Sequence, residues 1–194
     1  MRIVAGIAKG RRLAAPAGDA TRPTSDFVRE AIFNTLGSLI DLDGTSVADL
    51  FAGSGAMGIE ALSRGAASAT FVDADRKAIA AVRDNLEVTG LDGGDVHQSD
   101  VARWLERPRA HEPFDVVFVD PPYAFDGWDG LFDRLRAHVD DGPEGGLVVV
   151  ESDREVGPGE AWEVLKTKRY GSTVVTLTSR RPERPPDRNT WSHP

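Results

Sequence analysis

Four consecutive residues could carry out chemistry: Asp120, Pro121, Pro122 and Tyr123 follow an apolar run at 114–119 that predicts a buried strand. Proline has no backbone N–H, so this turn offers carbonyl oxygens that only accept hydrogen bonds and are held at fixed angles. With the Asp120 carboxylate they could accept both N–H groups of a nucleobase amine while Tyr123 stacks on the base. We predict that all four residues are catalytic and that the reaction is methyl transfer to a base nitrogen.

A second motif predicts the binding site of the electrophile. A strand expected at 47–51 leads into Ala52-Gly53-Ser54-Gly55-Ala56-Met57-Gly58 and then a helical pattern. Glycines at this spacing let the backbone turn sharply and approach a nucleotide-like ligand. Asp73 ends the next strand, twenty positions after Gly53, where an acid can accept the ribose hydroxyls. The ligand contacts expected here are Asp49, Phe51, Ala52, Gly53, Ser54, Gly55 and Asp73.

The glycine motif by itself fits NAD as well as S-adenosylmethionine. Hydride transfer has no use for a site that holds an amine, so the two motifs together favour S-adenosylmethionine. Asp100, after a strand at 94–98, is a candidate for contact with the adenine amino group, and a cap of the next helix is the alternative. Ser99 is a weaker alternative, and Asp75 is expected to cap the helix that follows it.

Three blocks of the chain closely resemble the bacterial 16S ribosomal RNA guanine-N2 methyltransferases of the RsmD type, over roughly residues 1–180. The first block is the most specific, because many methyltransferases share the other two. The blocks are Arg22-Pro23-Thr24-Ser25-Asp26-Phe27-Val28-Arg29-Glu30-Ala31-Ile32-Phe33-Asn34, residues 49–66 and Phe118-Val119-Asp120-Pro121-Pro122-Tyr123.

The resemblance implies methylation of the exocyclic N2 of a guanine in 16S rRNA, within the small ribosomal subunit or its assembly intermediate. It implies that S-adenosylmethionine is the methyl donor. No metal is expected, because displacing a neutral thioether from a sulfonium needs no metal ion. It also implies that the helix of the first block covers the cofactor or aligns the RNA. We therefore expect Thr24 at the cofactor and Arg22 and Arg29 at the RNA, while the apolar residues of the helix belong to the core.

Positive charge is concentrated at the two ends of an acidic chain. The net charge is −8, yet residues 1–36 carry +3 and residues 166–188 carry +5, against −16 between them. The first acidic residue of the chain is Asp19, and four basic residues precede it: Arg2, Lys9, Arg11 and Arg12. This local excess of positive charge favours contact with phosphates. The C-terminal cluster is equally consistent with a solvated end. The residues expected to bind RNA are Arg2, Lys9, Arg11, Arg12, Arg22 and Arg29.

Length and composition limit the kinds of protein and of binding site that this chain can form. The 194 residues suit one domain with a modest extension, and the absence of Cys excludes disulfides and thiolate metal sites. The four His residues are scattered without ligand spacing. No run is long and apolar enough to span a membrane, and the basic start lacks the apolar core of a signal peptide. We expect a cytoplasmic monomer.

Alternating patterns predict the fold. A helix is expected from Thr24 or Ser25 to about Ser38, and strands and helices then alternate to 151. In that alternation a strand at 114–120 leads to a helix at 129–139. The last two strands, about 162–169 and 172–179, are joined too tightly for a crossover helix and must pair as a hairpin. The prediction is an α/β class I (Rossmann-like) methyltransferase fold: a mostly parallel seven-stranded sheet with one reversed strand, plus an N-terminal β-ribbon turning near Lys9-Gly10 and a helix.

The expected division is an RNA-docking extension at 1–38, a methyltransferase domain at 39–180 and a disordered tail at 181–194. Three other functions remain open. A DNA adenine-N6 or cytosine-N4 methyltransferase uses the same four-residue motif, but only about 40 residues precede the core here, few for a DNA-recognition region. An NAD-dependent oxidoreductase would explain only the glycines. A non-enzymatic RNA-binding module would explain only the basic ends.

Overall fold

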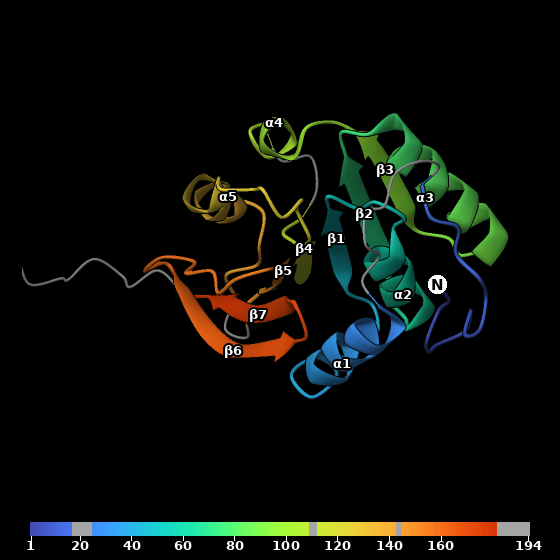
Figure 1. Ribbon diagram of the computed structural model, residues 1–194, viewed down its shortest axis with the longest axis horizontal. Coiled ribbons are helices and arrows are strands. Elements are labelled where there is room, and N and C mark those ends of the chain that lie inside the picture. Colours follow the sequence, from blue (N-terminus) through green and yellow to red (C-terminus); the bar gives the residue numbers. More distant parts are fainter. Residues whose placement is uncertain (17–24, 109–111, 143–144, 182–194) are drawn as a thin grey trace, which may run out of the picture.

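The computed structural model describes residues 1–16, 25–108, 112–142 and 145–181 (Figure 1). The predictions for Arg22, for Thr24 and for the tail beyond residue 181 lie outside the described residues. One seven-stranded sheet organises the molecule, with the strand order β3-β2-β1-β4-β5-β7-β6. The strands are β1 (Ser46–Leu50), β2 (Ser68–Asp73), β3 (Gly94–Gln98), β4 (Val116–Val119), β5 (Leu147–Ser152), β6 (Trp162–Tyr170) and β7 (Thr173–Arg180).

Strand directions match the prediction. Strands β1 to β5 pair in parallel, and β7 runs antiparallel to both of its neighbours, β5 and β6. The predicted mostly parallel sheet with one reversed strand is therefore confirmed. The strand order reverses between β1 and β4, and in sheets of this kind the crevice at such a reversal, outside the carboxyl ends of the strands, is where ligands bind.

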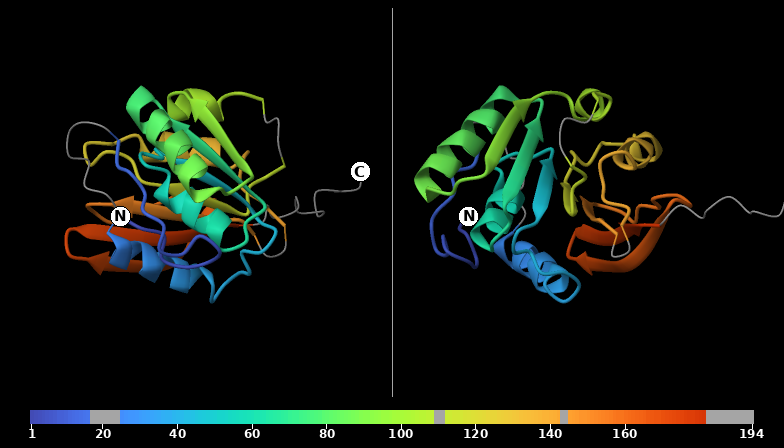
Figure 2. Two further views of the ribbon diagram at one scale, coloured as in Figure 1. Left: turned by 90° about the vertical axis from the view of Figure 1, so that its right-hand side faces the viewer. Right: turned by 180° about the vertical axis from the view of Figure 1, so that it is seen from behind.

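Helices cover both faces of the sheet (Figures 1 and 2). The helices α1 (Asp26–Leu36), α2 (Ala56–Ser63) and α3 (Arg76–Thr89) pack on one face, and α4 (Val101–Leu105) and α5 (Trp128–Leu135) pack on the other. Strands β1, β4 and β5 are almost wholly buried, because both of their faces are covered. Their continuous apolar runs follow from that burial, and each face has its own hydrophobic core.

The N-terminal arm, residues 1–16, differs from the predicted ribbon. Its two halves lie side by side, but they share a single antiparallel bridge, between Arg2 and Arg12. The peptide N–H groups of Val4 and Ala5 donate to the Glu60 carboxylate on α2, so they cannot form a ladder. The arm also buries Ile3, Ala8 and Leu13 in the core shared by α1, α2 and the sheet.

Some element ends also differ from the predicted ones. The helix predicted at 129–139 ends at Leu135, because Val139 forms a parallel bridge with Phe114 instead. The strand predicted at 114–120 is correspondingly shorter. Ser25 caps α1, its side chain accepting from the Val28 N–H at 3.2 Å, as one of the two predicted caps. Helix α1 ends at Leu36, two residues before the predicted end, and Gly37 is its C-cap.

Candidate active site

The two motifs meet at the reversal of the sheet. Leu50 of β1 pairs in register with Val119 of β4, and the Asp120 N–H donates to the Leu50 carbonyl at 3.4 Å. Asp120 therefore lies beside Phe51, where the glycine-rich loop begins. Parallel strands end at the same edge of a sheet, which explains why segments about 70 residues apart in the chain form one site.

Asp49, on β1, holds the segment that follows the glycine-rich loop through a hydrogen bond. Its carboxylate is buried and accepts the Gly58 N–H at 2.9 Å, which fixes the start of α2 to β1. Burial raises the pKa of Asp49, the N–H groups of Gly58 and Met57 lower it, and the Asp73 charge raises it. The net effect is a pKa of about 7. The geometry gives Asp49 a role in positioning the loop, and direct contact with a cofactor stays a prediction.

Residues 51–55, which are predicted to bind the cofactor and are called the cofactor loop below, have an unusual backbone. Phe51 has a positive φ of 60°, which is rare for a residue with a side chain and costs roughly 1–2 kcal/mol. Gly55 has φ 75°, and a Cβ there would lie 3.1 Å from Val82. At Gly58 a Cβ would lie 2.4 Å from the Phe71 ring, so α2 can approach β2 only with glycine at this position.

Asp73 lies where a ribose-binding acid was predicted. It ends β2, and its two carboxylate oxygens accept the Gly53 N–H at 2.9 Å and the Asp75 N–H at 2.8 Å. The carboxylate therefore borders the cofactor loop directly. Asp75 caps α3 through the Lys77 N–H at 2.8 Å, which confirms the role predicted for it.

Asp100 caps a helix, the alternative that the sequence left open. Its carboxylate accepts the Arg103 N–H at 3.0 Å at the start of α4, and the residue is exposed. Ser99 is buried beside it, and its N–H donates to the Asp73 carbonyl at 2.9 Å. The adenine contact predicted for Asp100 stays a prediction, at a position next to the acid of β2.

The predicted catalytic run forms a tight turn. Pro121 is buried, Asp120 is half-buried and Tyr123 is 47% exposed. The Pro122 carbonyl accepts the Phe125 N–H at 2.8 Å and so closes the turn. Of the two proline carbonyls, that of Pro122 is therefore committed to the shape of the loop, which leaves Asp120 and the Pro121 carbonyl as the candidate acceptors for an amine.

Sequence reasoning missed three residues around this turn. The Phe125 ring contacts Phe51 at 5.6 Å and Trp128 at 5.0 Å between centroids, forming an aromatic wall beside the cofactor loop. The Arg154 guanidinium, just after β5, donates to the Phe125 carbonyl at 2.7 Å and contacts the Tyr123 carbonyl at 3.5 Å. An aromatic residue shortly after Tyr123 was a usable signal for the wall, whereas nothing in the local sequence indicated Arg154.

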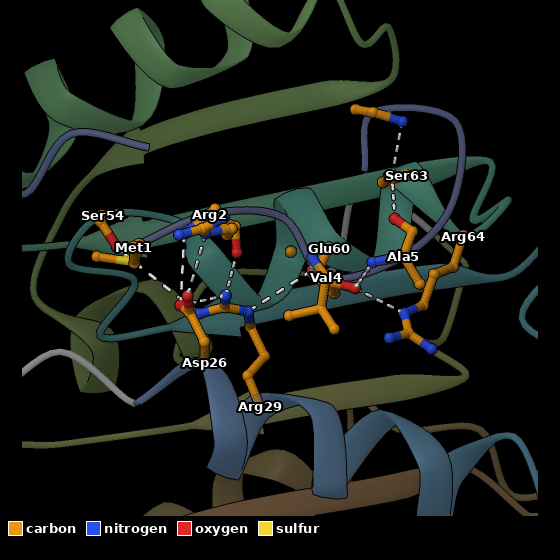
Figure 3. Close-up of polar contacts among 12 residues, drawn as sticks. Met1, Arg2, Val4, Ala5, Asp26, Arg29, Ser54, Glu60, Ser63 and Arg64 are labelled. Carbon is orange, nitrogen blue, oxygen red and sulfur yellow. Dashed lines mark hydrogen bonds and ion pairs between the residues drawn. The ribbon is translucent and has the colours of Figure 1, made fainter. Parts of the chain in front are cut away.

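Arg29 contradicts its prediction as an RNA contact, because its side chain is fully buried. The guanidinium pairs with Asp26 at 2.9 Å and Glu60 at 3.6 Å and donates to the Arg2 carbonyl (Figure 3). Burial raises the pKa of Asp26, but hydrogen bonds from Arg29 and from the Arg2 N–H outweigh it, so the net pKa is lowered. Arg29 joins α1 to the N-terminal arm and α2.

The other predicted RNA contacts of the arm are exposed. The Arg2 side chain is 69% exposed, and Lys9 and Arg12 are also exposed. Arg11 is exposed too, but its guanidinium donates to the carbonyls of Val88 and Thr89 at the end of α3. Arg11 therefore closes the last turn of a helix, and the remaining three cations are the better candidates for phosphates.

Two kinds of feature are absent from the described part of the chain. Within ranges 1–16, 25–108, 112–142 and 145–181, no three His, Cys, Asp or Glu residues gather closely enough to hold a metal ion. None of the helices in those ranges has the length and apolar character needed to cross a membrane.

Comparison with known proteins gives matches over nearly the whole chain. The family model described as "Conserved hypothetical protein 95" matches residues 1–179. A Bacillus subtilis protein is 41% identical over 189 residues, covering 93% of this chain and 100% of the relative. The Escherichia coli K12 protein named "Ribosomal RNA small subunit methyltransferase D" is 35% identical over 187 residues, covering 93% of this chain and 90% of the relative.

A solved Escherichia coli structure superposes with a TM-score of 0.81 at 32% identity, covering 94% of this chain and 99% of that one. These matches extend through the N-terminal block that carried the resemblance as well as the two motifs of the site. The family predicted from the sequence is therefore confirmed. The chain belongs to the family described as conserved hypothetical protein 95, which is the RsmD family.

Proposed function

We propose that this protein transfers a methyl group from S-adenosylmethionine to the exocyclic N2 of a guanine in 16S rRNA, in the cytoplasm. One observation carries the proposal: Asp120, in the run suited to an amine, lies beside Phe51 of the cofactor loop, joined through the Leu50 carbonyl at 3.4 Å. Relatives named "Ribosomal RNA small subunit methyltransferase D" support the RNA substrate. The choice of guanine N2 rests on the family resemblance.

The residues of the site fit the proposed cofactor. Asp73 borders the loop and can accept ribose hydroxyls, and Gly53, whose N–H donates to Asp73, has no side chain that would keep a ligand from the loop backbone. Bound there, S-adenosylmethionine would supply a methyl group on positively charged sulfur. The aromatic wall of Phe51 and Phe125 would limit water beside the reacting groups.

The chain's own groups would hold the base. Asp120 and the Pro121 carbonyl accept the two N–H bonds of the amine, and Tyr123 stacks on the base after it leaves its helix stack. The amine becomes strongly acidic only as the new N–C bond forms. Its proton then passes either to the Asp120 carboxylate or to water.

Substitution of Asp120 tests the proposal. Asp120→Ala should lower methyl transfer to unmodified 16S rRNA by at least about a hundredfold, because the amine loses an acceptor needed in the transition state. The dissociation constant for S-adenosylmethionine, measured by calorimetry, should stay within about twofold of wild type. Full activity of this variant would eliminate the role assigned to Asp120.

Product analysis separates the rival functions. Mass spectrometry of nucleosides should find N2-methylguanosine in rRNA treated with the enzyme. N6-methyladenine or N4-methylcytosine in treated DNA would establish the DNA methyltransferase instead. Binding of NAD in preference to S-adenosylmethionine would establish the oxidoreductase, and RNA binding with no transfer at all would establish the binding module.

A further inference from the structure

A pair of aromatic rings outside the active site has no role in the proposed reaction. Phe27, on the first turn of α1, is 68% exposed, although it is a large apolar side chain. Its ring meets the half-buried Tyr170 ring edge to face, with centroids 6.0 Å apart. Exposed rings of this kind commonly mark a binding surface.

Strand register places this pair at the same edge of the sheet as Asp120. Strand β6 runs in the direction of β4 and β5, because β7 is antiparallel to β5 and β6. Tyr170 is the last residue of β6 and pairs with Thr173, and the next residue of β7, Val174, pairs with Ser152 at the end of β5. The Tyr170 end of β6 therefore lies at the same edge of the sheet as the end of β4. In the strand order, β6 is two strands beyond β5.

Two lysines accompany the rings on the same face of β6. Lys166 and Lys168 pair with Leu177 and Val175, which face α1, and both lysines are exposed. The Lys168 Nζ lies 4.9 Å from the centre of the Tyr170 ring. With α1 they line a shallow apolar pocket whose other members are Ala31, Ile32, Thr35, Leu36, Val149, Val175 and Leu177.

Charge favours an anionic partner at this face. The chain as a whole carries −8, yet α1 lies between the basic N-terminal arm and the basic strand β6 (Figure 1). Of the two acids on α1, Asp26 is paired with Arg29 and Glu30 is exposed. The lysines of β6 place positive charge directly beside the Tyr170 ring.

We infer that Phe27, Lys166, Lys168 and Tyr170 form a docking surface for single-stranded RNA flanking the methylated guanine, and we name it the stacking surface. The inference rests on the proposed function in that RNA is the substrate. Alternating rings and cations suit an unpaired strand, because bases stack on the rings while phosphates approach the lysines. A duplex would hide its base faces and could use only the cations.

Paired variants test the stacking surface. Phe27→Ala should weaken binding of a short single-stranded RNA and of unmodified 16S rRNA about tenfold, with an unchanged salt dependence. Lys168→Ala should weaken binding and reduce the slope of log affinity against log salt by about 0.7. Each variant has a matched control. Phe27→Tyr keeps the ring and should bind RNA as wild type does.

Arg169→Ala is the control for Lys168→Ala. It removes the same charge from the opposite face of β6 and should change RNA binding less than Lys168→Ala.

Several outcomes would overturn the inference. Wild-type affinity in both Phe27→Ala and Lys168→Ala would remove the surface, as would an equal loss in Arg169→Ala. A defect seen only with assembled subunits, and not with RNA alone, would assign the face to a ribosomal protein. Thermal unfolding should be unchanged in Phe27→Ala because the ring is mostly exposed, so weaker binding cannot be attributed to misfolding.

The same samples separate this inference from the proposed reaction. If wild-type protein methylates guanine while Phe27→Ala and Lys168→Ala bind RNA normally, only the stacking surface fails. If both variants lose RNA affinity but the wild-type protein makes no N2-methylguanosine, the reaction fails and the surface stands.

Discussion

At the scale of single residues, Asp49 shows how the site holds its shape at a cost. Its carboxylate fixes α2 to β1 but is buried beside Asp73, so its pKa rises to about 7. Between the ordinary value of 3.8 and about 7, the folded protein binds a proton that the unfolded chain has lost. The free energy of unfolding should therefore fall as the pH rises through this range.

Asp49→Asn should remove that dependence. Asn keeps an acceptor for the Gly58 N–H without a charge, so the variant should lose less stability than wild type between about pH 4 and about pH 7. The wild-type loss from this residue is on the order of 4 kcal/mol. Urea unfolding of both proteins across the range measures the difference, and parallel curves would refute the assignment.

Gly58 is a purely steric requirement. Gly58→Ala should lower the free energy of unfolding by about 1–3 kcal/mol, because the new Cβ would overlap the Phe71 ring. The matched control is Gly130→Ala in α5, where a Cβ meets only the movable end of Arg134 and the helix gains from alanine. Equal stability of Gly58→Ala and wild type would show that α2 can shift without cost.

At the scale of elements, Glu60 joins three of them. Its buried carboxylate accepts from Val4 at 2.8 Å, Ala5 at 2.9 Å and Arg64 at 2.8 Å, and it pairs with Arg29 (Figure 3). The contact links the N-terminal arm, α1 and α2, and α2 starts at the cofactor loop. The arm is therefore attached to the part of the molecule that shapes the site.

Glu60→Ala should cost about 3–5 kcal/mol, since it leaves Arg29 buried without this partner and two N–H groups without an acceptor. Protease cleavage within the arm should accelerate in the variant. Arg64→Ala is the control, because Glu60 would keep its other partners, and it should cost clearly less. Similar losses in the two variants would contradict the central role of Glu60.

At the scale of the whole molecule, net positive charge is concentrated on the N-terminal arm and on the hairpin of β6 and β7, although the chain as a whole is acidic. Lys9→Ala with Arg12→Ala should reduce the salt slope of RNA binding by about 0.7–0.9 for each phosphate that the double variant no longer neutralises. Arg11→Ala should change the slope less, because its guanidinium serves the end of α3. An unchanged slope in the double variant would mean that the arm does not dock RNA.

Sequence reasoning succeeded where a local backbone need leaves a local signal. Gly55 and the proline pair mark turns that few other residues allow, and the short link at Gly171 forces the reversed strand. It failed where the decisive partner is distant. Arg29 reads as a surface cation until Glu60, on another helix, is placed against it, and Val139 reads as helical until Phe114 pairs with it.

Among the residues that the structure describes, β6 is an edge strand of the sheet. An unpaired edge strand can recruit a strand from a second chain, and charged side chains with an irregular backbone prevent this. Strand β6 has both, with a register shift between Val164 and Lys166 and lysines along its face. Replacing Lys166 and Lys168 with apolar residues would therefore promote self-association even if the fold kept its stability.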